Sequence, residues 1–235
     1  MKSTFFAALA MLSVASALPV EQPAEQPVEV LPVEQVSELD ARQFGASEDD
    51  LKDGKCAGNI FIFARGSTEI GNMGTICGPQ TCDGLKEELN GDAICQGVGT
   101  VDGYAADLAS NFLPANTNSK AINGAVGLIE QATTQCPGSN ILLSGYSQGS
   151  AVMTNAIQAL DASTKSRVKG VVMFGFTRNA QDDGQVPGFS AARTKVFCAL
   201  GDLVCANTLT ITPAHLTYGS DADDAASFLA SVART

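Results

Sequence analysis

Five short apolar runs alternate along this chain with segments of helical periodicity, and this order constrains the fold more than any other feature. The runs are rich in β-branched and apolar residues and occupy residues 59–64, 93–98, 140–145, 168–175 and 195–200. Apolar residues recur at helical spacing in 121–135, 148–160 and 221–233. Strands that alternate with helices predict a mostly parallel five-stranded sheet with helices on both faces. The predicted fold class is therefore α/β.

The first residues have the pattern of a secretory signal peptide. Lys2 is followed by an apolar run over 5–14 and by the small residues of 15–17, where such peptides are cleaved. The run is too short to span a membrane, and no later stretch is long enough. We therefore expect residues 1–17 to be removed and the protein to be secreted and extracellular.

Residues 18–43 form an acidic, proline-rich tract with a repeated PVEQ unit. Its prolines oppose a helix and its acidic residues cannot form a core, so it is interpreted as a propeptide or spacer. The chain carries a net charge of −11, to which residues 18–42 contribute six acidic residues and one basic residue. The rest, residues 44–235, has the length of a single domain and no basic stripe, so nucleic acid is not an expected partner.

Seven cysteines follow the signal peptide, at positions 56, 77, 82, 95, 136, 198 and 205. Behind a secretory signal they indicate disulfides, and the odd number leaves at least one outside an internal pair. With one histidine in the chain and no CxxC motif, we expect no metal site and no cofactor.

The stretch "SGYSQGS" at 144–150 contains a GxSxG motif between a predicted strand and a predicted helix. This setting is typical of a nucleophile elbow, a strained turn that exposes a serine, here Ser147. Gly145 and Gly149 would be required because a side chain at either position would clash where strand and helix pack closely. An ordinary strand-to-helix turn is the alternative interpretation.

A nucleophilic serine needs a base, and the base needs an acid to hold its tautomer. His215 is the single histidine, so it is either the base or a surface-loop histidine. Asp202 closely follows a predicted strand, and the order Ser147, Asp202, His215 is that of hydrolases. Asp182 and Asp183 are rival acids.

Two features of the flanking sequence would support such a site. Cys198 and Cys205 bracket Asp202, and a disulfide between them would hold the carboxylate in place. An oxyanion hole needs two donors, and the backbone N–H of Gln148 follows from the elbow. Ser67, in the polar turn after the first strand, could offer its N–H and its hydroxyl, although a solvated turn is the alternative.

Taken together, these segments resemble the cutinases, small secreted serine esterases of the α/β-hydrolase fold grouped with acetylxylan esterases in carbohydrate esterase family five. The resemblance covers about residues 45–235 and rests on "FARGSTEIGNMG" (63–74), "QGVG" (96–99), "SGYSQGS" (144–150), "CALGDLVC" (198–205) and "PAHLTYG" (213–219). "LDARQFG" before the domain is similar to the end of a cutinase propeptide.

The resemblance implies roles for individual residues. It makes Ser147 the nucleophile, Asp202 the acid and His215 the base, with Ser67 and Gln148 as oxyanion donors. It favours Asp202 over its two rivals, and it implies that Asn111 steadies the oxyanion serine. It also implies the disulfides Cys56–Cys136 and Cys198–Cys205.

The three other cysteines depart from the simplest family pattern. If a helix runs to about Leu89 and the chain returns as the strand at 93–98, Cys82 and Cys95 come level, each about 10 Å from the turn. We therefore expect these two to pair, as in some relatives with a third bridge, and Cys77 to be free.

The span from Ser147 to Asp202 is filled by one predicted helix, a strand, a loop and another strand, which leaves no place for a lid. Leu209, Ile211 and Leu216 flank the histidine and would line an apolar groove, although Leu209 could instead pack in the core. An uncovered serine suits an insoluble polyester such as cutin, or lipid esters, as substrate. We expect a monomer.

Two other functions are weighed against a cutinase. An acetylxylan esterase would use the same mechanism on a sugar polymer, but sugar platforms favour broad aromatic faces, and the chain has no Trp and three Tyr. A catalytically inactive secreted binding or elicitor protein would not need to keep all five catalytic positions.

Overall fold

The computed structural model describes residues 45–235. The predicted signal peptide and the proline-rich tract lie in residues 1–44, outside the described part, so both remain predictions. Five strands form one sheet in the order β2-β1-β3-β4-β5, and each neighbouring pair is parallel. Their bounds are β1 Asn59–Ala64, β2 Ala93–Gly97, β3 Asn140–Tyr146, β4 Val168–Phe174 and β5 Thr194–Phe197. The predicted five-stranded α/β class is confirmed.

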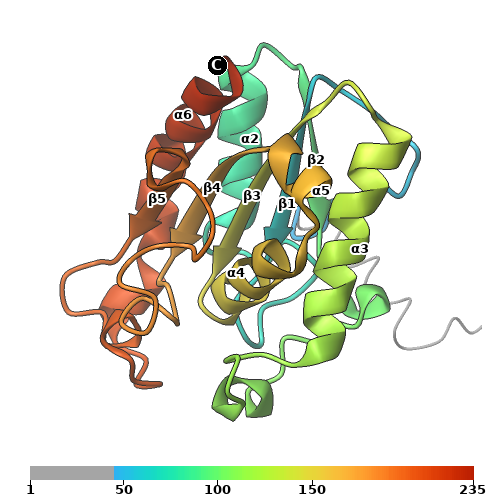
Figure 1. Cartoon of the computed structure of the whole chain (residues 1–235). Coiled ribbons are helices and arrows are strands. Elements are labelled where there is room, and N and C mark those ends of the chain that lie inside the picture. Colours follow the sequence, from blue (N-terminus) through green and yellow to red (C-terminus); the bar gives the residue numbers. More distant parts are fainter. Residues whose placement is uncertain (1–44) are drawn as a thin grey trace, which may run out of the picture. The chain divides into compact units, whose positions relative to one another are not determined.

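Helices cover both faces of this sheet (Figure 1). The α-helices are α2 Gly78–Glu88, α3 Ser119–Gln135, α4 Gln148–Ala159, α5 Ala162–Arg167 and α6 Ala222–Ala233. Helices α3 and α4 pack on one face and α2 and α6 on the other. Short 3-10 turns lie at Thr100–Asp102, Ala109–Phe112, Ala191–Arg193, Val204–Ala206, Pro213–Leu216 and Tyr218–Asp221. No helix within 45–235 is long and apolar enough to cross a bilayer.

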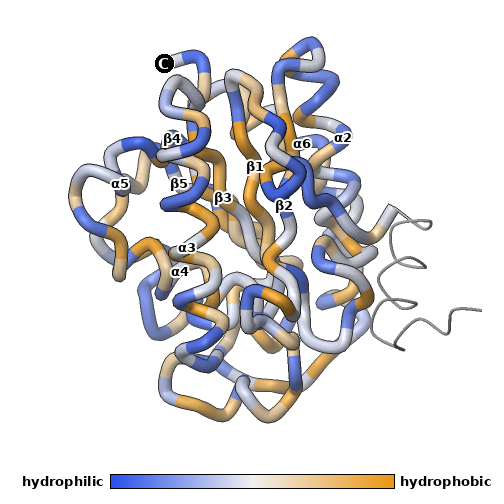
Figure 2. The backbone as a smooth tube through the Cα atoms, turned by 90° about the vertical axis from the view of Figure 1, so that its right-hand side faces the viewer, coloured by the Kyte–Doolittle hydropathy of each residue, from blue (hydrophilic) through white to orange (hydrophobic). Residues whose placement is uncertain are grey.

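The period-two alternation of strand side chains builds two separate cores. Ile60 and Ile62 of β1 pack under α3 and α4, whereas Phe61 and Phe63 pack under α2 and α6. All six residues of β1 are buried, and after Asn59 the strand is an uninterrupted apolar run, as expected for a strand covered on both faces. In Figure 2 the hydrophobic colours gather along the inner strands β1 and β3, and many of the outer loops have hydrophilic colours.

Most observed bounds lie within two residues of the predicted ones, and two differences are larger. The last strand ends at Phe197 rather than 200, because Cys198 opens a disulfide-closed turn in which Gly201 has a φ of +89°. The sequence also did not predict the six-residue helix α5, which follows α4 after two residues and is capped by the Asp161 carboxylate.

Helix α5 lies in the span where no lid was expected, but its position does not allow it to cover the serine. It ends at Arg167, directly before β4, and therefore lies at the amino edge of the parallel sheet. Between α5 and Asp202 the chain holds β4, a loop with one 3-10 turn, and β5. At the carboxyl edge, where the strand arrowheads point in Figure 1, this span therefore places the loop between β4 and β5 and no α-helix.

Three disulfides join the expected cysteine pairs. They are Cys56–Cys136, Cys82–Cys95 and Cys198–Cys205. Cys77 is the free cysteine, buried just before α2, and burial raises the pKa of its thiol. The second bridge ties α2 to β2, which agrees with the level positions expected for its two cysteines.

Candidate active site

Ser147 stands between β3 and α4 in a strained backbone conformation, with φ 52° and ψ −122°. A Cβ on Gly145 would lie 2.3 Å from the carbonyl oxygen of Gly149, and one on Gly149 would lie 1.9 Å from that of Ala64. Neither contact is possible for a real side chain, so both glycines are required by the close approach of backbone segments. Such strain is typical of a functional turn rather than an ordinary one.

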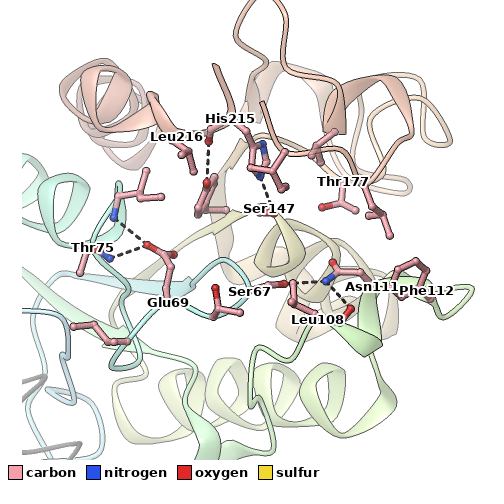
Figure 3. Close-up of a pocket in the computed structure, with 17 residues that line it drawn as sticks. Ser67, Glu69, Thr75, Leu108, Asn111, Phe112, Ser147, Thr177, His215 and Leu216 are labelled. Atoms are coloured by element: carbon pink, nitrogen blue, oxygen red, sulfur yellow. Dashed lines mark hydrogen bonds between the residues drawn. The ribbon is translucent and has the colours of Figure 1, made fainter. Parts of the chain in front are cut away.

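Three side chains form a hydrogen-bonded chain at the carboxyl edge of the sheet. Nε2 of His215 lies 2.9 Å from Oγ of Ser147, and its Nδ1 lies 2.8 Å from Oδ2 of Asp202. His215 is 2% exposed, and the Asp202 side chain is fully buried. Figure 3 shows the imidazole directed at the serine. The arrangement can move a proton from the serine to an imidazole that a carboxylate holds in place.

The rival acids lie elsewhere. Asp182 makes a two-pronged ion pair with Arg178, at 2.9 Å from Nε and 3.1 Å from Nη2. Asp183 is exposed. Of the three candidate carboxylates, the structure therefore brings Asp202 to the histidine.

The buried carboxylate of Asp202 has further donors besides the imidazole. The backbone N–H of Val204 donates to its Oδ1 at 2.9 Å, and the hydroxyl of Tyr218 donates to its Oδ2. The Cys198–Cys205 disulfide closes the turn in which Asp202 lies. A carboxylate bound on both oxygens keeps one orientation toward His215.

Two buried tyrosines support the acid and the base, and the sequence analysis did not assign either of them. Tyr146 donates a hydrogen bond to the backbone carbonyl of His215 at 2.8 Å, and its ring centroid lies 5.1 Å from the imidazole. Burial raises the pKa of Tyr146 and of Tyr218 well above the usual range, so both hydroxyls keep their protons, and stay donors, into the alkaline range. Their positions within "SGYSQGS" and "PAHLTYG" were the available signal.

Two residues are candidate oxyanion donors: Ser67, which lines the same groove as Ser147, and Gln148, which directly follows Ser147 in the sequence. Ser67 follows β1, and Asn111 donates from Nδ2 to its Oγ at 2.9 Å (Figure 3). Gln148 is the first residue of α4, and the first N–H groups of a helix have no partner within it. The buried Gln148 side chain donates to the carbonyl of Asp107 at 2.7 Å, which ties α4 to the loop of Asn111.

A groove of about 560 Å³ passes over the serine. Leu209, Ile211 and Leu216 line it, and they are 39%, 55% and 56% exposed. The alternative that Leu209 packs in the core is therefore wrong. Leu108 and Phe112, also exposed, line the groove beside Asn111 (Figure 3). An open apolar groove suits an acyl chain better than a charged ligand.

The chain matches known proteins over the same region. The family profile Cutinase matches residues 55–233. A protein named Probable cutinase 3, from Aspergillus fumigatus, is 57% identical over 195 residues, which are 83% of this chain and 88% of the relative.

Solved structures agree with this result. A Trichoderma reesei cutinase in complex with a C11Y4 phosphonate inhibitor superposes with a TM-score of 0.72 at 34% identity, covering 85% of this chain and 86% of that one. The structure of an acetyl xylan esterase shares the fold, with a TM-score of 0.54 at 21% identity. The match covers 76% of this chain and 100% of the esterase chain. With its α/β-hydrolase architecture and a profile match over most of its length, the chain belongs to the cutinase family.

Proposed function

We propose that this protein is a secreted serine esterase that hydrolyses the ester bonds of cutin and short to medium chain aliphatic esters through an acyl-enzyme. The observation that carries the proposal is the hydrogen-bonded chain from Ser147 through His215 to Asp202, below an apolar groove. The curated relatives are named cutinases, which supports the same activity.

Acylation begins with proton transfer from the serine. Nε2 of His215 accepts the proton of Ser147 Oγ as this oxygen attacks the ester carbonyl carbon. The buried carboxylate of Asp202 stabilises the imidazolium that forms. When the tetrahedral intermediate collapses, the C–O bond to the alcohol breaks and His215 returns the proton to the departing alkoxide.

The carbonyl oxygen becomes negative during the attack and needs donors. The N–H of Gln148 and the N–H and hydroxyl of Ser67 are the proposed donors. Asn111 fixes the Ser67 hydroxyl because its Nδ2 occupies the acceptor side of that oxygen, which leaves the proton to point at the substrate.

Deacylation repeats these steps with water as the nucleophile. His215 removes a proton from the water, which attacks the acyl carbon, and the regenerated Ser147 Oγ takes the proton back. His215 carries every proton in both halves, so the proposal includes no metal ion and no cofactor.

The proposed substrate follows from the shape and chemistry of the site. The groove is open and apolar, and no lid occupies the span between α4 and Asp202. A reactive serine that is not covered can reach an ester in the surface of an insoluble polyester. We further propose that the enzyme acts as a monomer, and that the signal peptide predicted for residues 1–17 directs its secretion.

Hydrolysis of p-nitrophenyl esters from acetate to palmitate, together with cutin and acetylated xylan, tests the proposal. We expect faster cleavage of the short and medium esters than of palmitate, and release of cutin monomers. Ser147→Ala should abolish all of these activities while the far-UV CD spectrum is kept. Cleavage of sugar acetates alone would indicate an acetylxylan esterase, and a wild-type protein without esterase activity would indicate a binding protein.

A further inference from the structure

The two loops that carry Ser67 and Asn111 are joined through two strained residues. Thr68 has a φ of 65° and Ala106 a φ of 52°, in a region that residues other than glycine rarely adopt. The N–H of Thr68 donates to the carbonyl of Ala106 at 2.9 Å, so the strain lies at the contact between these loops. A β-branched residue such as Thr68 keeps this conformation only when its surroundings hold it.

The Glu69 carboxylate supplies such a hold on one side of the strained residue. Its Oε2 accepts from the N–H of Gly66 at 2.7 Å, directly before Ser67. Its Oε1 accepts from the N–H groups of Thr75 and Ile76 at 2.8 and 3.0 Å. Figure 3 shows the carboxylate extended toward Thr75. One side chain therefore connects the residue before the oxyanion serine to the far end of the same loop.

The surrounding backbone is shaped to admit this carboxylate. A Cβ on Gly74 would lie 2.4 Å from Oε2 of Glu69, and Gly74 has a φ of +68°. The Arg65 Nε donates to the backbone carbonyl of Glu69 at 2.8 Å. Both the main chain and the side chain of Glu69 are thus fixed relative to Ser67.

A negative charge is not itself useful at this place. Glu69 lines the groove in which the substrate oxygen would become negative, and a carboxylate near a developing anion opposes that change. Its lone pairs are instead occupied by three backbone donors. The geometry of the carboxylate, rather than its field, is what the loop uses.

We propose that Glu69 is a positioning residue that holds Ser67 in the orientation required of an oxyanion donor. The inference rests on the proposed esterase function. Glu69 acts through Gly66, so its loss should weaken stabilisation of the transition state and leave substrate binding in the groove nearly unchanged.

The test measures kcat and KM for p-nitrophenyl butyrate in Glu69→Gln, Glu69→Asp, Ser67→Ala and the double variant Glu69→Gln/Ser67→Ala. We expect Glu69→Gln to lower kcat about tenfold or more with KM within about threefold, since loss of an oxyanion donor costs 10²–10³-fold and a misplaced donor is a partial loss. Glu69→Asp keeps the charge, but its side chain is one methylene too short to reach both the Gly66 N–H and the N–H groups of Thr75 and Ile76. It should therefore behave like Glu69→Gln. Glu130→Gln, an exposed carboxylate on α3, is the matched control and should match the wild type.

The double variant shows whether Glu69 acts through Ser67. The cost of Glu69→Gln should be at least about threefold smaller in the Ser67→Ala background, because the hydroxyl is already absent and only the backbone N–H of residue 67 is left for Glu69 to position. An equal cost in both backgrounds, recovery of kcat in Glu69→Asp, or a kcat for Glu69→Gln near that of the wild type would each overturn the inference. If Glu69→Gln does not fold by CD, Glu69→Asp and Glu69→Asp/Ser67→Ala decide the same comparison. Activity that survives in Ser147→Ala would instead refute the proposed function.

Discussion

Replacement of Tyr218 by phenylalanine removes one hydroxyl from the buried support of Asp202. The Tyr218 side chain is fully buried, donates to Oδ2 of Asp202 and accepts from the N–H of Ala199 at 3.0 Å. The variant therefore loses a hydrogen bond to a carboxylate and leaves a backbone N–H without this acceptor. The bonds of Asp202 to His215 and to the Val204 N–H remain.

The expected loss of stability can be worked from these two bonds. A hydrogen bond to a charged group contributes about 1.5–3 kcal/mol, and an unsatisfied buried N–H costs about 1–3 kcal/mol. With partial relaxation we expect a total of about 3 kcal/mol, which lowers Tm by roughly 6–12 °C for a domain of this size. If about 1 kcal/mol of this loss also reaches the transition state, kcat falls about fivefold with little change in KM.

The effect on stability should also depend on pH. Burial and the bond to Asp202 raise the pKa of Tyr218, so the folded protein keeps this proton at a pH where the unfolded chain has lost it. A raised folded pKa contributes stability that is fully present below the unfolded value, about 10, and is lost as the pH rises through the folded value. The difference between the wild type and Tyr218→Phe should therefore shrink above about pH 10, by about 1.4 kcal/mol per pH unit.

Denaturant unfolding at about pH 8 and about pH 11, with ester kinetics at the lower pH, measures all three effects. Tyr104→Phe is the control, because Tyr104 is also buried but donates to the neutral carbonyl of Arg65. It should lose only about 1 kcal/mol and show a smaller change in kcat. A Tyr218→Phe variant with wild-type Tm and kcat would refute the view that this hydroxyl supports Asp202.

Two further predictions concern the turns around the site. Replacing Cys198 and Cys205 together by serine should lower the free energy of unfolding by about 2.5 kcal/mol, because the loop-closure entropy of their short turn is lost. The same change should lower kcat by a larger factor than it raises KM. An unchanged kcat, measured well below the variant's Tm, would assign the bridge a purely structural role. Gly149→Ala places a Cβ 1.9 Å from a backbone carbonyl oxygen of β1, so little soluble folded protein should be recovered, and a variant with wild-type Tm would contradict the described packing.

The fold was predictable because four of its five strands, β1 to β4, are almost entirely buried. Each of these strands then contains a short run rich in apolar residues, and the alternation of such runs with helical segments predicts the parallel sheet. Helix α5 was not predicted because its sequence, ASTKSR, has no apolar face. The N-cap residue Asp161 is its one local sequence signal. The end of β5 was misplaced because apolar residues continue past Phe197 into a turn that the disulfide closes.

The site was predictable where the chemistry restricts the choice of residue. A single histidine, a GxSxG motif and an aspartate after a strand leave few ways to assemble the three groups that the structure brings together. The supporting residues were not predictable in this way. Tyr146 and Tyr218 contact residues 69 and 16 positions away, and Glu69 binds backbone N–H groups. The motifs that contain these residues therefore do not show what they contact.

The three groups of the site are held by different physical means. Ser147 is fixed by close packing of β1, β3 and α4, where the two glycines admit no side chain. Asp202 and His215 instead lie in the turns after β5. The Cys198–Cys205 disulfide and the Tyr218 hydroxyl link parts of this segment to one another, and the Tyr146 hydroxyl ties it to β3. The packing around β1 and β3 is lost only when the sheet itself unfolds, whereas the disulfide and the two tyrosine hydrogen bonds can be removed one at a time. The loss of one such bond, without unfolding of the sheet, should therefore displace Asp202 and His215 while Ser147 stays in place.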